Sequence, residues 1–492
     1  MLIAVLGFQQ HKWPSVERTR LFYERALSAE FQLRIVADGN ELVSVPEPDL
    51  ILNFGGSVGW ELDPRPDCPL AFALHGGTVI DYEFLAERVP RYRDTDIFLV
   101  NCRSDEAILQ SLVEGTVRTA RLSLPVDLTT FRRRDKTECR SLLPVTADFL
   151  LGFVARLIPQ KNLHGFLDIL AKVKARLAPK TVHGLVIGNY WLDYPVLPYC
   201  TAQYPALIQQ TLIALDLQRD VTFLPASLTD EQLALCYAGM DVLVHPTSSI
   251  DENFGYAPVE AMGCGTPVVG TAYGGLKDTV LHGKTGYLIQ TWMTPNGIRM
   301  DTAAAVDAVT SLLKDIRLCH GMSVAATRHV ASNYSEAACG LVLRKALRET
   351  IRTSRERTPV RMRASSPRRI DPKNQGTGGL PDVSPPWGQY VVPVSHYVSG
   401  SPPEAGECLH FLLAGRSRID QGGTVTLEDP AWPARYQLGE ADLSLIEIVR
   451  GRGTVSPQAI LEAFPFEPQE ALTSRLQRLM DVGILVGSKA SA

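Results

Sequence analysis

Long apolar runs, paired cysteines and a strong net charge are all scarce in this chain of 492 residues. No segment approaches the ~20 consecutive apolar residues that a membrane-spanning helix needs. The nine cysteines include no C-x-x-C pair, so their spacing indicates neither a zinc ribbon nor a disulfide framework and favours a reducing compartment. The formal net charge of −4 gives no reason to expect broad nucleic-acid binding. We therefore expect a cytoplasmic protein without a transmembrane segment.

The remaining composition is that of an ordinary globular protein, with 45% hydrophobic and 21% charged residues. The length predicts two or three domains. Residues 1–6 are apolar, but the run is too short for a signal peptide and has no basic flank. We expect this run to be the first strand of the fold.

Residues 1–131 alternate short apolar runs with segments of helical periodicity. The predicted strands are 2–6, 32–37, 49–54, 70–74, 97–100 and 119–124, and the predicted helices are 15–29, 81–91 and 104–114. This alternation predicts a doubly wound parallel sheet in an α/β domain. The loops that follow the strands, at 7–13, 55–57 and 75–77, are candidate binding loops.

A second domain of the same kind is predicted over residues 149–334, after a polar linker at 132–148. Its predicted strands are 149–155, 182–188, 221–224 and 241–245, and its predicted helices are 163–177, 229–237, 301–313 and 317–333. The helical segment 335–352 follows and is the candidate for a helix that crosses back to the first domain.

Two carboxylates, Glu252 and Glu260, bracket a turn directly after the predicted strand 241–245. Pro258 lies where the first position of the following helix is expected. Ligands of parallel α/β sheets bind at the carboxyl ends of the strands, and a helix start favours a diphosphate. The amides expected to point outward are those of Phe254, Gly255 and Tyr256. The alternative is a capped turn in which Glu252 is solvated and Glu260 is a first-turn acid favoured by the helix dipole.

Two cations, Arg156 and Lys161, occupy one predicted strand-to-helix loop after the strand at 149–155. A guanidinium supplies a forked set of donors and an ammonium supplies a point charge, a combination suited to a diphosphate. The alternative is a pair of solvated surface cations.

The E-x7-E string from Glu252 to Glu260 is followed in order by P-V-V at 267–269, G-G at 274–275 and H-G-K-T-G-Y at 282–287. This succession resembles the signature of retaining glycosyltransferases of family 4 and their relatives. The resemblance implies the GT-B fold, which has two Rossmann-like domains, and a nucleotide-diphosphate sugar as donor. It covers about residues 1–352 and is more specific in the second domain than in the first.

The resemblance also implies roles for individual residues. Glu260 would hold the ribose hydroxyls, Glu252 and the backbone of 254–256 would hold the sugar, and Arg156 with Lys161 would stabilise the leaving diphosphate. The complete donor-binding set is Glu260, Asn253, Phe254, Gly255, Tyr256 and Gly188. His75, at the end of a predicted strand, resembles the histidine that faces the transferring sugar; the alternative is a histidine hydrogen-bonded at a strand end.

No metal and no cofactor other than the donor substrate are expected. Asp94-Thr95-Asp96 matches the D-x-D motif of another glycosyltransferase fold, but it precedes a strand in the wrong architecture. The first loop departs from the family because it has only Gly7 where the family has a glycine pair, and residues 189–204 form an aromatic insertion after the strand at 182–188. The acceptor is left open by these departures.

The last part of the chain differs in character. Residues 345–373 hold ten Lys or Arg against three acids, and a Pro-rich stretch then runs to 403, so we expect 353–403 to be a flexible linker. Strands at 409–413, 424–427 and 483–486 and helices at 441–450, 456–464 and 469–482 predict a small winged-helix-like α+β domain over 404–492. Its shape loosely resembles the peptide-recognising winged helices attached to some peptide-modifying enzymes. From residue 401 on, eight basic and twelve acidic side chains argue against DNA as the partner.

The sequence therefore predicts a retaining glycosyltransferase whose acceptor is a glycan, lipid, small molecule or peptide. The alternatives are a catalytically silent nucleotide-sugar-binding or peptide-binding protein, and another GT-B reaction such as nucleotide-sugar epimerisation. A nucleic-acid-modifying glycosyltransferase is disfavoured by the acidic C-terminal domain.

Overall fold

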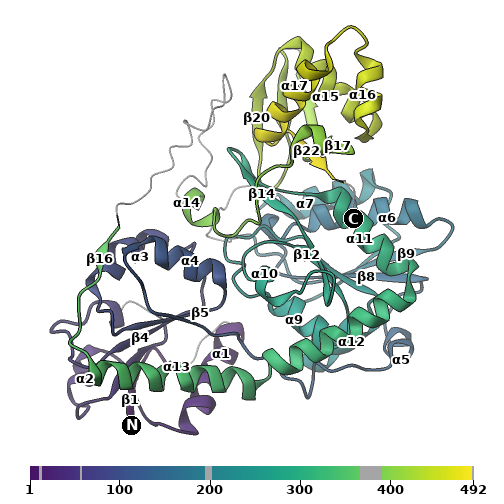
Figure 1. Cartoon of the computed structure of the whole chain (residues 1–492). Helices are drawn as coiled ribbons and strands as arrows, with labels where there is room; N and C mark the ends of the chain where they lie inside the picture. Colours follow the sequence, from purple (N-terminus) through teal and green to yellow (C-terminus); the bar gives the residue numbers. More distant parts are fainter. Residues whose placement is uncertain (10–13, 56–57, 194–201, 366–389, 421, 490–492) are drawn as a thin grey trace.

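The computed structural model describes residues 1–9, 14–55, 58–193, 202–365, 390–420 and 422–489. The chain forms two α/β domains side by side and a smaller C-terminal unit that is stacked on the second domain (Figure 1). The architecture is the α/β fold with two parallel-sheet domains that the sequence predicts.

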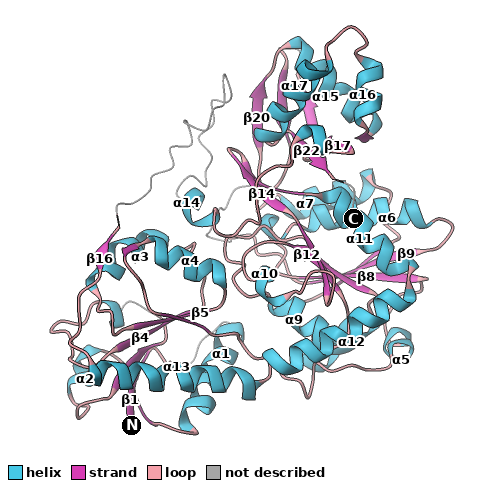
Figure 2. Cartoon of the chain, viewed as in Figure 1, coloured by secondary structure: helices cyan, strands magenta, loops and turns pink. Residues whose placement is uncertain are grey.

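The first sheet has six parallel strands in the order β2-β1-β3-β4-β5-β7. They are β1 (Leu2–Leu6), β2 (Gln32–Val36), β3 (Leu50–Asn53), β4 (Leu70–Leu74), β5 (Ile97–Val100) and β7 (Thr119–Arg121). The central strands β3, β4 and β5 are buried along their whole length, because helices cover both faces of the sheet (Figure 2). All six strands predicted for this domain are present, with ends that differ by up to three residues.

The helices of the first domain are α1 (Pro14–Ser28), α2 (Gly39–Val43), α3 (Tyr82–Arg88) and α4 (Arg103–Ser111). A later helix, α13 (Glu336–Glu356), returns from the second domain and packs against α1 (Figure 1). Its apolar face, with Leu343 and Leu347 fully buried, joins Phe22 and Leu27 of α1 in one hydrophobic core. The helix predicted at 335–352 thus completes the first domain.

The second sheet also has six parallel strands, in the order β10-β9-β8-β11-β12-β13. They are β8 (Phe149–Val154), β9 (Val182–Ile187), β10 (Val221–Leu224), β11 (Val242–His245), β12 (Val268–Thr271) and β13 (Gly286–Ile289). Both six-stranded sheets place the first strand of the domain inside the sheet, so the strand order reverses there and the loops at that edge diverge.

The second domain is covered by α6 (Leu163–Leu177), α7 (Tyr204–Ala214), α8 (Asp230–Gly239), α9 (Tyr256–Gly263), α10 (Leu276–Thr279), α11 (Thr302–Lys314) and α12 (Ile316–Asn333). A hairpin of β14 (Thr291–Thr294) and β15 (Gly297–Met300) follows the sheet. The stretch predicted as a linker at 132–148 contains a short helix, α5 (Lys136–Ser141), that packs against α8. Across the described parts of the chain, no helix is both long and apolar enough to span a membrane.

The C-terminal unit, residues 404–489, contains two small antiparallel sheets and three main helices. One sheet has the order β21-β17-β22 and the other β18-β19-β20. The strands are β17 (His410–Leu413), β18 (Ser417–Ile419), β19 (Thr424–Leu427), β20 (Ala434–Gln437), β21 (Thr454–Val455) and β22 (Leu485–Ser488). The helices are α15 (Glu440–Arg452), α16 (Pro457–Ala463) and α17 (Gln469–Asp481). The three predicted helices are present, whereas β18, β20 and β21 were not predicted.

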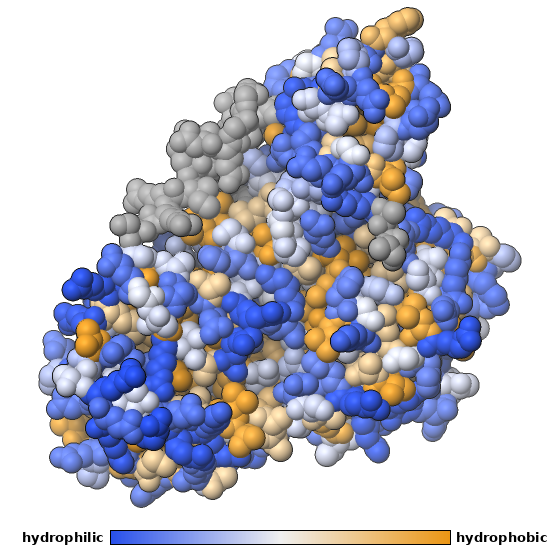
Figure 3. All heavy atoms as spheres, viewed as in Figure 1, coloured by the Kyte–Doolittle hydropathy of each residue, from blue (hydrophilic) through white to orange (hydrophobic). Residues whose placement is uncertain are grey.

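This unit is joined to the second domain by buried contacts. The Trp432 indole donates to Ser248 Oγ at 3.0 Å and covers Gly297, where an added Cβ would lie 2.5 Å from the ring. Arg299 donates to the Gly483 carbonyl at 2.9 Å. In the space-filling view, hydrophilic side chains predominate over the surface and apolar ones gather between the C-terminal unit and the second domain (Figure 3).

The segment before the C-terminal unit does not fit the predicted flexible linker. Residues 390–400, which we call the strap, contain α14 (Val391–Val394) and bury Tyr397 completely. Gly274 donates its amide to the Tyr397 carbonyl at 2.9 Å, and Lys277 Nζ donates to the carbonyls of His396 and Val398. The Pro-rich part at 366–389 lies outside the described residues, but the strap is a packed element between the two domains.

Candidate active site

The loop that carries Glu252 leaves the carboxyl end of β11 and is buried along most of its length. Thr271, at the end of β12, donates its hydroxyl to the Thr247 carbonyl at 2.6 Å. The Ser248 amide donates to the Gln160 carbonyl at 2.9 Å. The loop is thus hydrogen-bonded to the end of β12 and to the loop after β8, and these bonds fix the position of its carboxylates.

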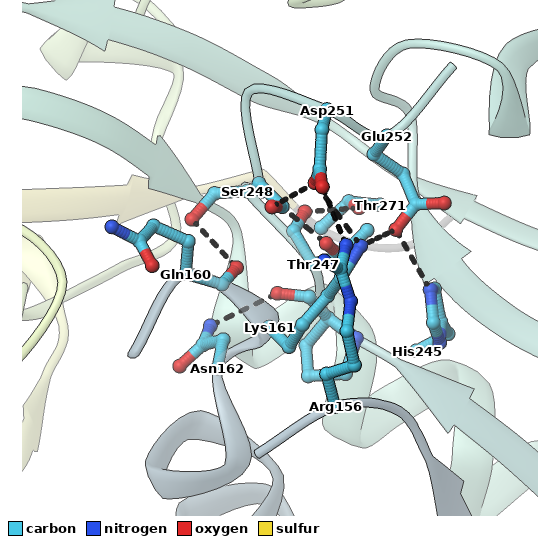
Figure 4. Close-up of polar contacts among 12 residues, drawn as sticks. Arg156, Gln160, Lys161, Asn162, His245, Thr247, Ser248, Asp251, Glu252 and Thr271 are labelled. Carbon is cyan, nitrogen blue, oxygen red and sulfur yellow. Dashed lines mark hydrogen bonds and ion pairs between the residues drawn. The ribbon is translucent and has the colours of Figure 1, made fainter. Parts of the chain in front are cut away.

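The two cations predicted to act together do meet the carboxylates of this loop. Lys161 Nζ lies 2.6 Å from Glu252 Oε2, and Arg156 Nη2 lies 2.5 Å from Asp251 Oδ2. Figure 4 shows both cations, from the loop after β8, pointing toward the carboxylates from the loop after β11. His245 Nε2 approaches Glu252 Oε2 at 3.2 Å from the other side. The structure therefore brings two cations, two carboxylates and one histidine into one cluster.

Charge within this cluster keeps the carboxylates ionised despite their burial. Burial alone would raise the pKa of Glu252, but Lys161 and His245 hold the pKa below its usual range. Asp251 behaves similarly: burial opposes ionisation, and the charges of Lys161 and Arg156 outweigh it and lower the pKa. Because the carboxylates are negative, they in turn fix the two cations at the mouth of the β8 loop.

The second carboxylate, Glu260, lies on α9 and is 5% exposed. It accepts hydrogen bonds from Tyr237 at 3.1 Å and from Arg18 of the first domain at 3.2 Å. Burial raises its pKa, and the Arg18 charge opposes that effect. Glu260 is therefore a buried carboxylate at the domain boundary and not a solvated acid in the first turn of a helix.

Helix α9 begins earlier than predicted. Gly255 has φ +88° and caps the helix, so α9 starts at Tyr256 and Pro258 is its third residue. A left-handed backbone at this position favours glycine. The rings of Phe254 and Tyr256 pack edge to face with centroids 5.0 Å apart, and the Tyr256 hydroxyl lies 3.1 Å from Thr19 Oγ1 of the first domain.

His75 follows β4 and is hydrogen-bonded through both ring nitrogens. Asn101 Oδ1 lies 2.6 Å from Nδ1, and the Tyr23 hydroxyl lies 2.6 Å from Nε2. An amide oxygen accepts, so Nδ1 carries the proton and Nε2 accepts from Tyr23. Burial lowers the pKa of His75 to about 4, with the Asn101 hydrogen bond opposing the shift, and the ring is neutral at pH 7.

Asn253 connects His75 to the Glu252 loop. Its Nδ2 donates to the His75 carbonyl at 3.2 Å and lies 3.4 Å from Asp105 Oδ2. Asp105 is fully buried and also accepts from Thr78 and from Tyr397 of the strap, the latter at 2.6 Å. Burial raises the pKa of Asp105, and these hydrogen bonds oppose the rise. Asp105 thus joins both domains and the strap at one point beside the cluster.

Asn101 and Asp105 are not among the candidate site residues that the sequence predicts. The structure places Asn101 on the His75 ring and Asp105 under Asn253. No local spacing could reveal this, because the hydrogen bond between Tyr397 and Asp105 spans 292 residues.

The remaining predicted residues are placed as follows. Gly188, after β9, has no room for a side chain, since a Cβ there would lie 2.0 Å from the Ala155 carbonyl oxygen. The predicted binding loops at 7–13 and 55–57 and the aromatic insertion at 189–204 each include residues outside the described ranges. Asp94 and Asp96 have structural partners: Asp94 accepts from the Val360 amide, and Asp96 pairs with Arg65 at 2.6 Å.

Residues 135–329 match the family model described as "Glycosyl transferases group 1". The chain is 30% identical over 293 residues to a D-inositol 3-phosphate glycosyltransferase of Mycobacteroides abscessus, across 56% of this chain and 60% of that enzyme. It is 28% identical over 295 residues to the enzyme of the same name from Rhodococcus erythropolis, across 57% of this chain and 62% of that enzyme. The chain thus spans about 60% of the length of these curated relatives.

Solved structures show the same fold. HepE of Anabaena, in complex with UDP and glucose, aligns with a TM-score of 0.55 at 18% identity over 71% of this chain and all of that one. Sucrose-phosphate synthase of Thermosynechococcus elongatus aligns with a TM-score of 0.58 at 18% identity over 72% of this chain and 99% of that one. The family model thus covers most of the second domain, and the solved structures share the α/β fold with two Rossmann-like domains.

Proposed function

We propose that the protein is a retaining glycosyltransferase that takes its sugar from a nucleotide-diphosphate sugar. The cluster of Lys161, Glu252, Arg156 and Asp251 at the carboxyl ends of β8 and β11 carries this proposal. Its cations lie on a strand-to-helix loop, where a diphosphate is favoured. UDP and glucose in the HepE structure, and the glycosyltransferase names of the relatives, support the same donor class.

In the proposed reaction, Arg156 and Lys161 stabilise the diphosphate as negative charge develops on it. Electrostatic help of this kind is worth most in a site from which water is excluded. Glu252, Asn253 and the backbone of 254–256 hold the sugar. Three buried polar atoms near the cluster have no hydrogen-bond partner among the described residues: Asn101 Nδ2, His245 Nδ1 and Tyr273 Oη. Buried polar atoms are nearly always paired, so these atoms support a ligand at this place.

Glu260 would accept the ribose hydroxyls, with Tyr237 and Arg18 fixing its carboxylate. Gly188 would border the nucleotide, because the absence of a side chain lets its backbone lie directly against the Ala155 carbonyl, next to Arg156. His75 would face the transferring sugar as a neutral ring, since its pKa of about 4 keeps it uncharged at pH 7.

Retention would follow from attack on the same face of the sugar that the diphosphate leaves, assisted by that diphosphate. Neither a carboxylate nucleophile nor a metal ion is part of the proposal, because the two cations supply the positive charge. The acceptor class is open among glycans, lipids, small molecules and peptides. The C-terminal unit, docked on the donor domain, is the proposed element that selects a peptide or protein acceptor.

A thermal-shift panel of nucleotide-diphosphate sugars, with and without EDTA, tests the donor. A shift with one donor that EDTA leaves unchanged supports the proposal and identifies base and sugar. Lys161→Met should abolish the shift, whereas Lys174→Met, on the following helix α6 and paired with Asp220, should preserve it. The absence of a shift with every donor would remove the support for the cluster as a donor site.

Turnover separates the enzyme from the alternatives. Transfer to an acceptor extract that Glu252→Gln abolishes, with the thermal midpoint of the variant preserved, supports a transferase. Donor binding without consumption of the donor indicates a binding protein. An altered sugar that stays on its nucleotide indicates epimerisation.

A further inference from the structure

A pocket of 590 Å³ lies between the second domain and the C-terminal unit, apart from the Glu252 cluster. Helices α6 and α7 and strand β15 line one side, and β17, the turn between β19 and β20 and the end of α15 line the other. We call this space the junction pocket. Small-molecule sites commonly occur at domain interfaces and measure about 300–1,000 Å³.

Part of the lining of the junction pocket is apolar. Leu207 and Met300 contribute from the second domain, and Leu412, Trp432 and Val486 from the C-terminal unit. A water-filled space against such a lining is unfavourable, and an apolar group in it would gain about 25 cal/mol per Å² of buried surface. The lining therefore fits a ligand with a ring or hydrocarbon body.

Three arginines of the C-terminal unit, Arg416, Arg450 and Arg452, line the same pocket. None of them has an ion-pair or side-chain hydrogen-bond partner within the ranges that the structure describes. They approach from two elements, the residues after β17 and the end of α15. The carboxylates that also line the pocket, Asp168, Glu428 and Asp429, are paired with Lys172, Arg418 and His164. The three guanidinium groups therefore remain available to bind an anion.

The distribution of the other cations shows that this gathering is specific to the pocket. The paired basic side chains of the C-terminal unit are Arg418, Arg475, Arg478 and Lys489. Four others have no ion-pair partner among the residues that the structure describes, and of these Arg435 is the one that does not line the pocket. The unit as a whole is acidic, with twelve acids against eight bases from residue 401 on, so three arginines without ion-pair partners at one pocket run against its overall charge.

We propose that the junction pocket binds a small anion with an apolar body, such as a carboxylate, sulfonate or phosphate carried on a ring or short hydrocarbon chain. The apolar lining takes the body, and the three arginines take the charged group. This site is separate from the donor site of the proposed function and does not depend on that function.

An occupant of the pocket would contact the back of the Glu252 loop. Ser248 lines the pocket, accepts from the Trp432 indole, and donates its amide to Gln160, which precedes Lys161. Asp251 follows three residues later on the same loop. The ligand would thus reach the loop of the carboxylate cluster without entering the cluster.

Titration of the full-length protein with 1-anilinonaphthalene-8-sulfonate, an apolar ring system with one sulfonate, tests the proposal by fluorescence. We expect one saturable site per chain. Arg450→Gln with Arg452→Gln should weaken binding at least tenfold, and Arg435→Gln, which removes an unpaired arginine outside the pocket, should change it less than twofold. Gln210→Trp, at an exposed position that lines the pocket from α7, should block the site without a change of charge in the C-terminal unit.

Unsaturable binding, or equal affinity in wild type and in both pocket variants, would overturn the proposal. Glu252→Gln should leave the dye affinity unchanged, which keeps this result distinct from the test of the donor site. Loss of dye binding in Glu252→Gln but not in the pocket variants would place the dye in the donor cleft and refute the junction pocket.

Discussion

Tyr397 and Tyr273 offer a comparison of two buried hydroxyls in almost the same place. Both side chains are fully buried, and their rings meet edge to face at 5.4 Å. The Tyr397 hydroxyl donates to Asp105 at 2.6 Å, whereas the Tyr273 hydroxyl has no partner among the described residues. Replacing either tyrosine by phenylalanine removes one hydroxyl oxygen from this packed pair. The difference between the two variants therefore measures how much the hydrogen bond from Tyr397 to Asp105 contributes to stability.

The two variants should differ in the stability of the strap. Tyr397→Phe leaves Asp105 with its bonds from Thr78 and Asn253, but the loss of one hydrogen bond to a buried carboxylate costs about 1–3 kcal/mol. Tyr397→Phe should therefore favour local opening of the strap by that amount, which corresponds to a ~5- to 150-fold increase in opening. Tyr273→Phe removes an unpaired hydroxyl and should have an effect close to zero or slightly stabilising.

Amide hydrogen exchange followed by mass spectrometry measures this opening directly. The reporters are peptides that cover 391–400 and the amide of Gly274, which donates to the Tyr397 carbonyl. Faster exchange in Tyr397→Phe only would support the hydrogen bond as the fastening of the strap. Equal exchange in the two variants would refute the reasoning, because the Asp105 contact would then contribute nothing to holding the strap.

Three further outcomes are expected. Lys161→Met leaves the buried Glu252 carboxylate without its cation and should cost about 3–5 kcal/mol in urea denaturation, and adding Glu252→Gln should recover part of the loss. Gly297→Ala places a Cβ against Trp432 at φ +113°, so it should loosen the C-terminal unit and shift tryptophan emission to the red; unchanged emission would contradict this close contact. Because His75 has its pKa lowered to about 4 from 6.5, the unfolded chain binds the proton first as pH falls, and stability should decline between pH 6.5 and 4 by about 1.4 kcal/mol per unit. His75→Gln should remove that part of the slope in pH-dependent denaturation.

The two sheets could be predicted from the sequence because their signal is local. Buried parallel strands such as β3 and β11 are short apolar runs, and each is followed by a turn and a helix with its own periodicity. The approach of Lys161 to Glu252 could be predicted for a related reason: both follow strands of one sheet, and parallel strands bring their carboxyl ends to one edge.

Long-range contacts could not be predicted in this way. The sequence around the strap is rich in proline and small residues, which is typical of a linker. The contacts of the strap with Asp105 and Gly274 make it a packed element. The start of α9 was misplaced by two residues because Pro258 is an equally good residue at the first or third position, while the left-handed Gly255 decides the boundary. Likewise Arg18, on α1, gave no sequence signal of its contact with Glu260.

The return of α13 to the first domain has a consequence for the order of folding during synthesis. Cys339, Leu343, Leu347 and Ile351 belong to the hydrophobic core that also contains Ile3 and Phe22. A nascent chain that has released only residues 1–131 therefore lacks one wall of its own core. The strands and helices of the second domain end by residue 333, so this domain is completely synthesised before α13 is. The amino-terminal domain is thus synthesised first, but its hydrophobic core can be completed only after the second domain has been synthesised.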